Sequence, residues 1–429
     1  MEKLMQIAKK NADHVLIRNI KEEMTNVSFE NGELKNIETS IASNIALTLI
    51  KDGKIGFAYT TNLIDREQFV KNALTSLKGG VDGSYGISNS GDPVKLNSYD
   101  KSIENIGTSQ LVDEAKRTID YLKTKTDGQV NLEQGMVKEE IRILNSNGVD
   151  YSQKNSSYFL YPMVLYPGSY SSVMRAFASK SLKNTDQNIL DLLLNLYNSS
   201  NKQVCPPGGQ MKVLFLPEAF YTIAWRMISA LSSENAYYNI SPIKDKIGSK
   251  IFSSMITAYD NPIDDTMPGS RSFDDEGTVT SKVMLIENGV LQSFYFDRKT
   301  AKKMGTKSTG NGYCREISRL PKPDVRNFTI EAGALTIEQM IKSIDKGVIV
   351  PSVLGAHSGN IPNGDFSVGL SPGIYVENGE IVGHVNDSMV AGNIYDVLNK
   401  VIAIENEKHL ASMGCFPAVL FDNINVVMK

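Results

Sequence analysis

Runs of β-branched and aromatic residues, separated by two-residue polar turns, recur along the chain. The runs 283–286 and 290–296 flank Asn288-Gly289, a dipeptide in which both residues readily adopt the positive φ of a type I′ turn. The same Asn-Gly pair, or Asp-Gly, stands between strand-like runs at 31–32, 52–53, 147–148 and 378–379. This pattern predicts a chain built largely from antiparallel hairpins.

Amphipathic segments between these hairpins predict flanking helices. Apolar residues recur at helical spacing in 65–77 and 109–122, and the segment 187–197 is strongly apolar on one face. Pro217 and Glu218 suit the first turn of a further helix that runs to residue 231. We therefore expect an α+β fold, with large antiparallel sheets built from hairpins and flanked by helices.

Two stretches interrupt the periodic pattern and suggest boundaries. Residues 78–97 are rich in glycine and serine and read as an exposed loop. Residues 198–210 contain Pro206-Pro207-Gly208-Gly209, and we place the main boundary there. The expected N-terminal α+β domain, 1–207, holds a hairpin region at 25–60, helices near 65–77 and 109–122, and central strands at 130–180. The expected C-terminal β-rich domain is 208–429.

Charge and cysteine content narrow the class of protein. The chain has 45 Lys and Arg against 48 Asp and Glu, a formal net charge of −3, so bulk charge provides no attraction to nucleic acid. Apolar runs are too short to span a membrane, and charges interrupt the N-terminal segment, so neither a membrane protein nor a secretion signal is expected. Three widely separated cysteines indicate a reducing compartment, and we expect the cytoplasm.

Five motifs in the second half occur in a distinctive order. They are Pro268-Gly269-Ser270-Arg271-Ser272-Phe273-Asp274-Asp275-Glu276-Gly277, Ser308-Thr309-Gly310-Asn311, Asn363-Gly364-Asp365-Phe366-Ser367, Gly373-Ile374-Tyr375-Val376-Glu377-Asn378-Gly379-Glu380 and Met389-Val390-Ala391-Gly392-Asn393. In this order and spacing they resemble the C-terminal domain of the TldD/PmbA family, from about residue 210 onward. The family's older name, modulator of DNA gyrase, gains no support from the charge of this chain.

The resemblance also implies whether this chain should bind a metal. In the catalytic chains of this family, the helix after the first C-terminal strand resembles His-Glu-x-x-x-His, whose histidines hold zinc while the glutamate acts as general base. The equivalent helix here, 218–231, contains no histidine. The resemblance therefore implies the TldE, or PmbA, branch, with no metal and no catalytic residue in this chain. The degenerate motif region is Ala224, Trp225, Arg226, Met227, Ile228 and Ser229. We expect Trp225 and Met227 to fill the ligand region and Arg226 to repel a cation.

Other candidate ligands are scattered. The four histidines, at positions 14, 357, 384 and 409, are never spaced i, i+4, and we interpret them as surface or hydrogen-bonded residues. Glu405, Glu407 and His409 are expected in a charged helix or loop. Cys415 falls near the family's C-terminal cysteine, which is thought to complete the zinc ligand set. Without histidine partners we interpret it as a small buried residue, with a ligand role as the alternative.

Two groups of polar residues are candidates for a substrate groove. The first is Arg271 with Asp274, Asp275 and Glu276, for which structural or groove-forming, cation-binding and catalytic roles are all open. The second is Asp365, Ser367 and Asn393, which stand beside glycines that permit close approach of another backbone. Asn393 is alternatively a cap for the segment after it.

The leading hypothesis is a non-catalytic partner subunit of a cytoplasmic zinc-dependent peptidase that acts on unstructured peptides. Its partner is expected to be a TldD-type homologous subunit, which would hold the zinc, or a second copy of this chain. We expect pairing through the C-terminal half, and neither nucleic acid nor membrane as a partner. The alternatives are a stand-alone peptide-binding or regulatory protein without proteolytic activity, and an enzyme that uses Asp274, Asp275, Glu276 and Cys415.

Overall fold

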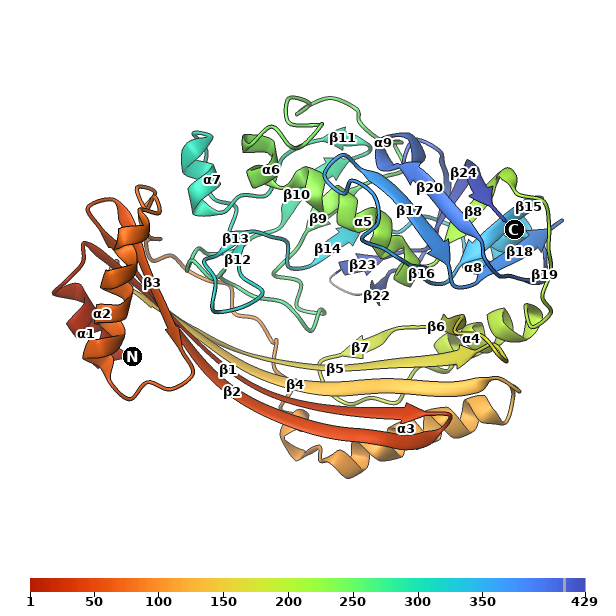
Figure 1. Ribbon diagram of the computed structural model, residues 1–429, viewed down its shortest axis with the longest axis horizontal. Coiled ribbons are helices and arrows are strands. Elements are labelled where there is room, and N and C mark those ends of the chain that lie inside the picture. The colour runs from red at the N-terminus through yellow and green to blue at the C-terminus, as the bar shows by residue number, and fades with distance from the viewer. Residues whose placement is uncertain (412–413, 429) are drawn as a thin grey trace.

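A seven-stranded antiparallel sheet forms one side of the molecule (Figure 1). The computed structural model describes residues 1–411 and 414–428. The sheet has the order β3-β2-β1-β4-β5-β6, and β7 also pairs with β5. Its strands are β1 (His14–Glu30), β2 (Glu33–Lys51), β3 (Lys54–Thr60), β4 (Gln129–Asn145), β5 (Asp150–Leu165), β6 (Ser172–Met174) and β7 (Phe177–Ser179).

The hairpin turns have the geometry that their dipeptides predict, with one exception. Asn31 and Gly32 have φ of 51° and 76°, and the turns at 52–53, 288–289 and 378–379 likewise have two positive values. At 147–148 only Gly148 has a positive φ, 92°. The expectation of a type I′ turn there is wrong, because the side chain of Asn145 accepts from the backbone N–H groups of residues 147 and 149 and stabilises a different turn.

Helices cover the ends and the convex face of this sheet. They are α1 (Glu2–Lys9), α2 (Arg66–Ser76), α3 (Thr108–Lys123) and α4 (Gln187–Ser199). Helix α3 lies on the face opposite the C-terminal half (Figure 1), and its apolar stripe, Leu111, Ala115, Ile119 and Leu122, is buried. The segment 78–97 is a largely exposed loop, as expected, and Ile87 and Ser88 anchor it by packing into the protein.

The second half of the chain contains two mixed sheets, of nine and six strands. The nine-stranded sheet comprises β8 (Gly209–Phe215), β15 (Lys346–Val350), β16 (Val353–Leu354), β17 (Asp365–Leu370), β18 (Gly373–Glu377), β19 (Glu380–Val385), β20 (Met389–Asn393), β21 (Val401–Ile404) and β24 (Val419–Val427). The six-stranded sheet comprises β9 (Ala258–Asp260), β10 (Val283–Glu287), β11 (Val290–Leu291), β14 (Phe328–Ile330), β22 (His409–Ala411) and β23 (Gly414–Phe416). A small pair, β12 (Gly312–Tyr313) and β13 (Lys322–Pro323), completes the strands described.

Helix α5 (Pro217–Leu231) packs at the centre of this half. Its core neighbours come from both mixed sheets, and Phe220 contacts the rings of Phe416 and Phe421. The remaining helices are α6 (Ser233–Tyr237), α7 (Arg298–Lys303), α8 (Ile337–Lys342) and α9 (Ile394–Val397). Strands β8 and β15 pair in parallel, as do β14 and β23, which the hairpin pattern did not predict.

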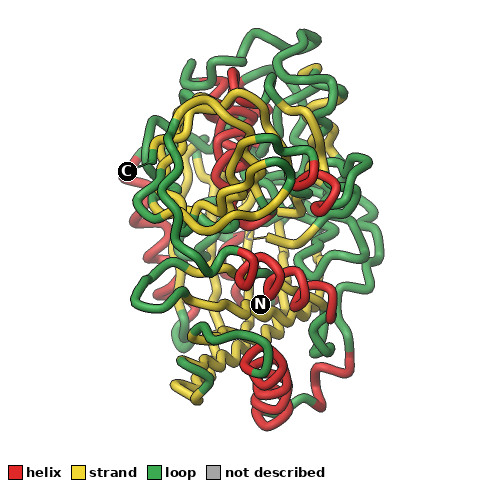
Figure 2. The backbone as a smooth tube through the Cα atoms, turned by 90° about the vertical axis from the view of Figure 1, so that its right-hand side faces the viewer, coloured by secondary structure: helices red, strands yellow, loops and turns green. Residues whose placement is uncertain are grey.

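The two halves share one apolar core. A single cluster joins side chains of β1, β4, β5, α3 and α4 to side chains of β8, β15 and β18. Figure 2 shows the C-terminal half above the long sheet and a helix below it. The α+β class with large sheets is confirmed. Among the helices described, none is long and apolar enough to cross a membrane.

We predict that Gly289→Ala destabilises the protein more than Gly53→Ala. Both glycines have positive φ, 80° and 71°, so alanine adds strain of about 1–2 kcal/mol at either site. A Cβ at 289 would also lie 2.2 Å from the carbonyl oxygen of Phe252, whereas a Cβ at 53 has nothing within 4 Å. Urea unfolding should show a further loss of about 1 kcal/mol or more for Gly289→Ala, and equal losses would contradict the prediction.

Candidate functional site

Helix α5 carries the six residues 224–229 that the sequence resemblance aligns with the metal motif. Ala224, Met227 and Ile228 point into the apolar core. Trp225 lies partly exposed, stacked on Tyr221 with 6.1 Å between the ring centroids. Ser229 lies on the same, less buried face. Trp225 and Met227 therefore project from different faces of α5, and only Met227 belongs to the core.

Arg226 is fully buried and is saturated by backbone carbonyl groups. Its Nε donates to the oxygen of Asp365 at 2.6 Å, and its Nη1 donates to Thr222 at 2.7 Å and to Ala356 at 3.1 Å. Its Nη2 donates to the oxygen of Ser358 at 2.6 Å. Burial lowers the pKa of this guanidinium from its ordinary range. Carbonyl oxygens around a buried charge offset its lost hydration, so Arg226 joins α5 to the segment 356–365.

The second candidate group meets this helix through Asp365. Strands β17 and β20 pair Asp365 with Asn393, and the Asn393 Nδ2 donates to the Asp365 carboxylate at 2.9 Å. The Oδ1 of Asn393 accepts from the N–H of Tyr395 and caps α9. Ser367 lies half-buried on β17, opposite Ala391.

The acidic motif lies elsewhere and is buried. Asp274 accepts from the N–H groups of Glu276 and Thr278 through Oδ1, and from Gly312 through Oδ2. Glu276 accepts from the N–H of Arg298 at 2.8 Å. These carboxylates organise the turn 274–278 and hold β12 and the start of α7 against it. Their geometry is that of structural acceptors for backbone amides.

Asp275 is the charged partner of Arg271. The Arg271 Nη1 donates to Asp275 at 2.9 Å, and the Cys314 N–H donates to the other carboxylate oxygen at 2.9 Å. Although burial by itself raises the pKa of Asp275, the guanidinium groups of Arg271 and Arg18 lower it overall. Within the described residues, Arg271 Nε and Nη2 and the hydroxyl of Tyr313 have no hydrogen-bond partner.

The net pKa shift of the neighbouring carboxylates is in the opposite direction, because no guanidinium offsets the effect of burial enough to reverse it. It raises the pKa of Asp274 to about 7 and that of Asp260 to about 6. It also raises the pKa of Glu276 well above the ordinary value, and the nearby Asp274 charge adds to the effect. In these groups the desolvation of the carboxylate exceeds the stabilisation by its hydrogen bonds.

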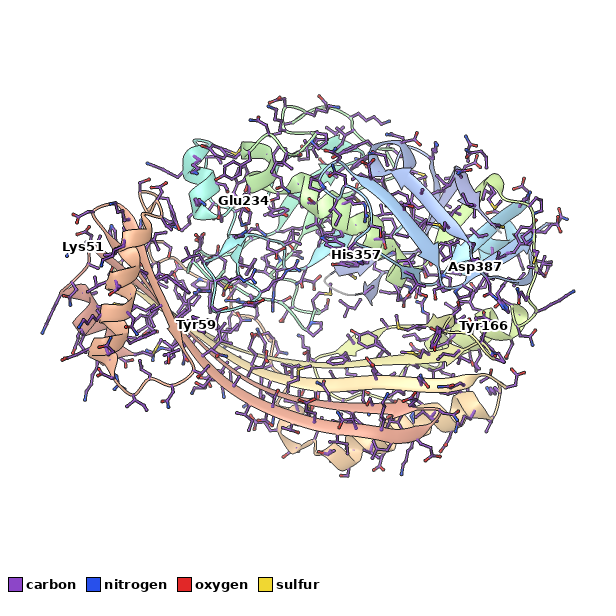
Figure 3. The ribbon with its side chains drawn as sticks, in the orientation of Figure 1. Lys51, Tyr59, Tyr166, Glu234, His357 and Asp387 are labelled. Carbon is purple, nitrogen blue, oxygen red and sulfur yellow. The ribbon has the colours of Figure 1, made fainter. Side chains whose placement is uncertain are left out.

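Two adjoining cavities lie between the long sheet and the C-terminal half. Their volumes are about 450 and 440 Å³, and both are lined by Glu22, Glu139, Tyr313, Cys314, Arg315 and Arg326. Phe159 and Tyr161 of β5 line only the first, and Tyr59 of β3 lines only the second. Figure 3 shows Tyr59 on the side of the sheet that faces the C-terminal half. We call the two cavities together the interdomain groove.

Of the residues selected from the sequence, Arg271 and Asp275 line the groove. Asp274 and Glu276 lie behind them, and Asp365, Ser367 and Asn393 do not line either cavity. The groove residues of β1, β2, β3, β4 and β5 were missed. Each occupies an ordinary alternating strand position, and no local motif marks the face that meets another domain.

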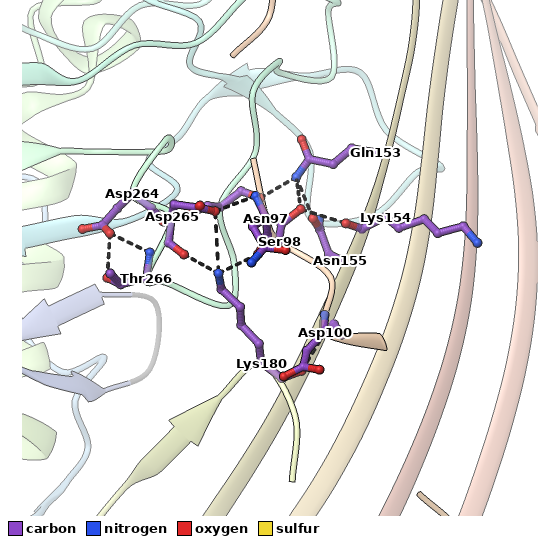
Figure 4. Close-up of polar contacts among 12 residues, drawn as sticks. Asn97, Ser98, Asp100, Gln153, Lys154, Asn155, Lys180, Asp264, Asp265 and Thr266 are labelled. Atoms are coloured by element: carbon purple, nitrogen blue, oxygen red, sulfur yellow. Dashed lines mark hydrogen bonds and ion pairs between the residues drawn. The ribbon is translucent and has the colours of Figure 1, made fainter. Parts of the chain in front are cut away.

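A polar network closes one flank of the groove (Figure 4). The Asn97 N–H donates to the Asp265 carboxylate at 2.6 Å, and Lys180 donates to the carbonyl oxygen of Asn97 at 2.6 Å. Gln153 donates to the carbonyl oxygen of Ser270 at 2.7 Å. These contacts hold the segment 265–270, which includes the groove residues 267–269, against the long sheet.

The residues described do not fit a resident zinc ion. Within 1–411 and 414–428, no three His, Cys, Asp or Glu side chains form a group suited to a metal. Cys415 is buried, and burial raises the pKa of its thiol to about 11, which disfavours the thiolate that zinc requires. The Nε2 of His409 lies 2.9 Å from the Glu405 carboxylate, which accepts. Glu407 lies in a loop, as expected, whereas His409 does not, because pairing with β23 orders its segment as the strand β22.

We predict that Asp274→Asn reduces the loss of stability as pH rises from 5 to 8. A carboxyl group whose pKa is about 7 when folded, against an ordinary value of 3.8, keeps its proton in the folded protein while the unfolded chain has lost it. This stabilisation is complete below the unfolded pKa and is lost as pH rises through 7. The free energy of unfolding should therefore fall more steeply with pH in the wild type than in Asp274→Asn, by up to about 1.4 kcal/mol per pH unit.

Asp275→Asn is the matched control for this measurement. The pKa of Asp275 is lowered, so the group is ionised in both states between pH 5 and 8 and contributes no slope there. Unfolding in denaturant at several pH values should show that Asp275→Asn is less stable than the wild type. Its free energy of unfolding should change with pH as steeply as that of the wild type. Identical slopes for wild type and Asp274→Asn would contradict the prediction.

Comparisons with known proteins agree with this architecture. The TldE structure from Thermococcus kodakarensis has a TM-score of 0.91 and 25% identity, covering 100% of this chain and 99% of its own. An uncharacterized protein of Methanocaldococcus jannaschii is 28% identical over 98% of each chain. A protein of the same organism, named as a metalloprotease, is 24% identical over 97% of this chain and 94% of its own.

Family models cover two segments of the sequence. The PmbA/TldA metallopeptidase C-terminal domain matches residues 208–428, and domain 1 of the same metallopeptidases matches residues 17–77. The first match alone spans more than half of the chain. The chain belongs to the PmbA/TldD family.

Proposed function

We propose that this chain is the non-catalytic subunit of a zinc-dependent peptidase that acts on unstructured peptides. The observation that carries the proposal is Arg226. A fully buried guanidinium, bonded to four carbonyl oxygens, occupies the helix that presents metal ligands in motif-bearing relatives. Removing it to accommodate a cation would leave those carbonyl groups without donors. The helix is thus retained as scaffold, and we assign the zinc to a partner subunit.

The interdomain groove supports a role in handling peptide. Its walls carry the aromatic residues Phe159, Tyr161 and Tyr313, and the carboxylates of Glu22 and Glu139. Apolar surface with a few oriented polar groups is typical of sites that bind peptides without reading a strict sequence.

The relatives support the same assignment. One structural relative is named TldE, and one relative by sequence is named a metalloprotease. We infer that this chain corresponds to the subunit type without the metal motif, pairing with a motif-bearing TldD-type homologue in the cytoplasm. A stand-alone peptide-binding or regulatory protein is the alternative that the experiments below separate from it.

We predict that the purified chain, prepared without a histidine tag, holds well below one zinc per chain. The reason is the donor set: α5 offers a guanidinium, and His409, although it lies on the strand beside Cys415, stands opposite Phe416 and therefore projects from the other face of the sheet. Elemental analysis with Cys415→Ser as the companion variant provides the test. A stoichiometric zinc that disappears in Cys415→Ser would overturn the non-catalytic assignment.

We also predict that co-expression with a motif-bearing TldD-type homologue yields a complex that cleaves unstructured peptides and is inhibited by chelator. In this complex, Ala178→Trp should lower cleavage at least tenfold, because Ala178 lines the groove and tryptophan would fill it. Val382→Trp, an exposed change on β19 outside the groove, is the matched control.

The results distinguish the two functions. Peptide binding by this chain alone, without any complex with the homologue, would favour the stand-alone protein. Full activity of the homologue without this chain would contradict a subunit role. Equal cleavage by the Ala178→Trp and Val382→Trp complexes would contradict the role of the groove.

A further inference from the structure

Strand β2 is paired along only part of its outer edge. Its inner edge pairs with β1 over its whole length, but β3 covers only Ile45–Lys51. Among the described residues, the segment 36–44 has no strand on its other side, and it lies at the border of the long sheet (Figure 1). Successive residues of a strand direct their backbone groups to opposite edges, so every second residue of this segment presents a donor and an acceptor that no described strand satisfies. We call this segment the open edge.

The open edge lacks the features that usually protect a free strand. It contains one charged residue, Glu38, and no proline, and its pairing with β1 is regular; the irregularity of that hairpin lies nearer the turn, at Ser28 and Phe29. Two large apolar side chains point from it into solvent. Ile41 is 80% exposed and Ile37 is 42% exposed. A long, apolar, unpaired edge of this kind is a template for another strand.

The sequence of the open edge is complementary to itself. In an antiparallel pairing of two copies centred on Thr39, Ile37 of one copy stands directly opposite Ile41 of the other, twice by symmetry. Glu38 then faces Ser40, and no like charges oppose each other. Ile37, Thr39 and Ile41 share one face of the strand, so the two sheets continue into each other with the same face up.

We propose that the open edge of β2 pairs antiparallel with the same edge of a second copy of this chain, about a two-fold axis at Thr39. The joined sheet places both interdomain grooves on one side, because a two-fold axis perpendicular to the sheet preserves its faces. The sequence alone had led us to expect pairing through the C-terminal half. This interface rests on the fold and does not require the proposed function.

Cysteine cross-linking tests the pairing and its register together. In a Cys205→Ser background, which removes the exposed cysteine, Thr39→Cys should give a disulfide-linked dimer within minutes of mild oxidation. Directly opposed residues in antiparallel strands have Cα atoms about 4.5–5.5 Å apart, within disulfide range. Ile41→Cys is the matched control: its two copies would be displaced by four residues, about 13 Å, and should remain unlinked.

A charge exchange provides an independent test that does not depend on oxidation. Ile37→Glu alone should weaken the dimer at least tenfold in sedimentation equilibrium, because it buries a carboxylate against Ile41 of the other copy. Combining it with Ile41→Lys should restore dimerisation, since the two introduced charges then face each other. Ile64→Lys is the control: Ile64 is 78% exposed, close to the 80% of Ile41, but it lies in the loop before α2. This variant should dimerise as tightly as the wild type.

The outcomes decide the proposal. Cross-linking of Thr39→Cys, with rescue by the double charge variant, supports it. A monomer at tens of micromolar, a dimer in which Thr39→Cys stays unlinked, or a dimer insensitive to Ile37→Glu would overturn it. Pairing only with a motif-bearing homologue, and never with itself, would also overturn it while leaving the proposed function intact.

Discussion

The rest of the structure depends on the continuous backbone pairing of β1. This strand has 17 residues, and it is hydrogen-bonded to β2 along its whole length and to β4 over most of it. A sheet of this length cannot bury its own faces, so each face requires a cover. Helix α3 covers the convex face, and the C-terminal half covers much of the concave face, with one apolar core between them. The interdomain groove is the part of the concave face that this cover does not fill.

Charged groups specify how the two halves meet, beyond what apolar burial requires. The long sheet contributes Arg18, which donates to Cys314 and to the carbonyl oxygen of Arg319 at 2.7 Å. The loop before α3 contributes Asn97, bonded to Asp265. Hydrogen bonds of this kind require a defined distance and angle between the two halves, whereas apolar packing alone tolerates small shifts between them. Burying unpaired charges is costly, so only an arrangement that pairs them is stable. The acidic motif acts in the same way within the C-terminal half, because its carboxylates accept hydrogen bonds from backbone amides of β12 and α7.

Helix α5 is held in place by apolar packing and by one buried charge. The helix packs between two sheets through eleven buried positions, so the apolar core requires it whatever its polar residues do. Arg226, buried in the same helix, orders the segment 356–365 through its bonds to carbonyl oxygens. Family membership accordingly follows from the core and the turns.

The sequence by itself determined most of the local structure: four of the five Asn-Gly and Asp-Gly turns, the capped helices and the family motifs all act through neighbours in the chain. It also pointed to α5 as a helix without histidines. Tertiary structure alone decided that β8 pairs in parallel with β15, more than a hundred residues away, and that Phe159, Glu139 and Tyr313 line one groove. It likewise decided that part of β2 stays unpaired, because strand periodicity shows which face is apolar but not where a neighbouring strand ends. Long-range contacts of this kind leave no local pattern, since they depend on how separate elements are packed together.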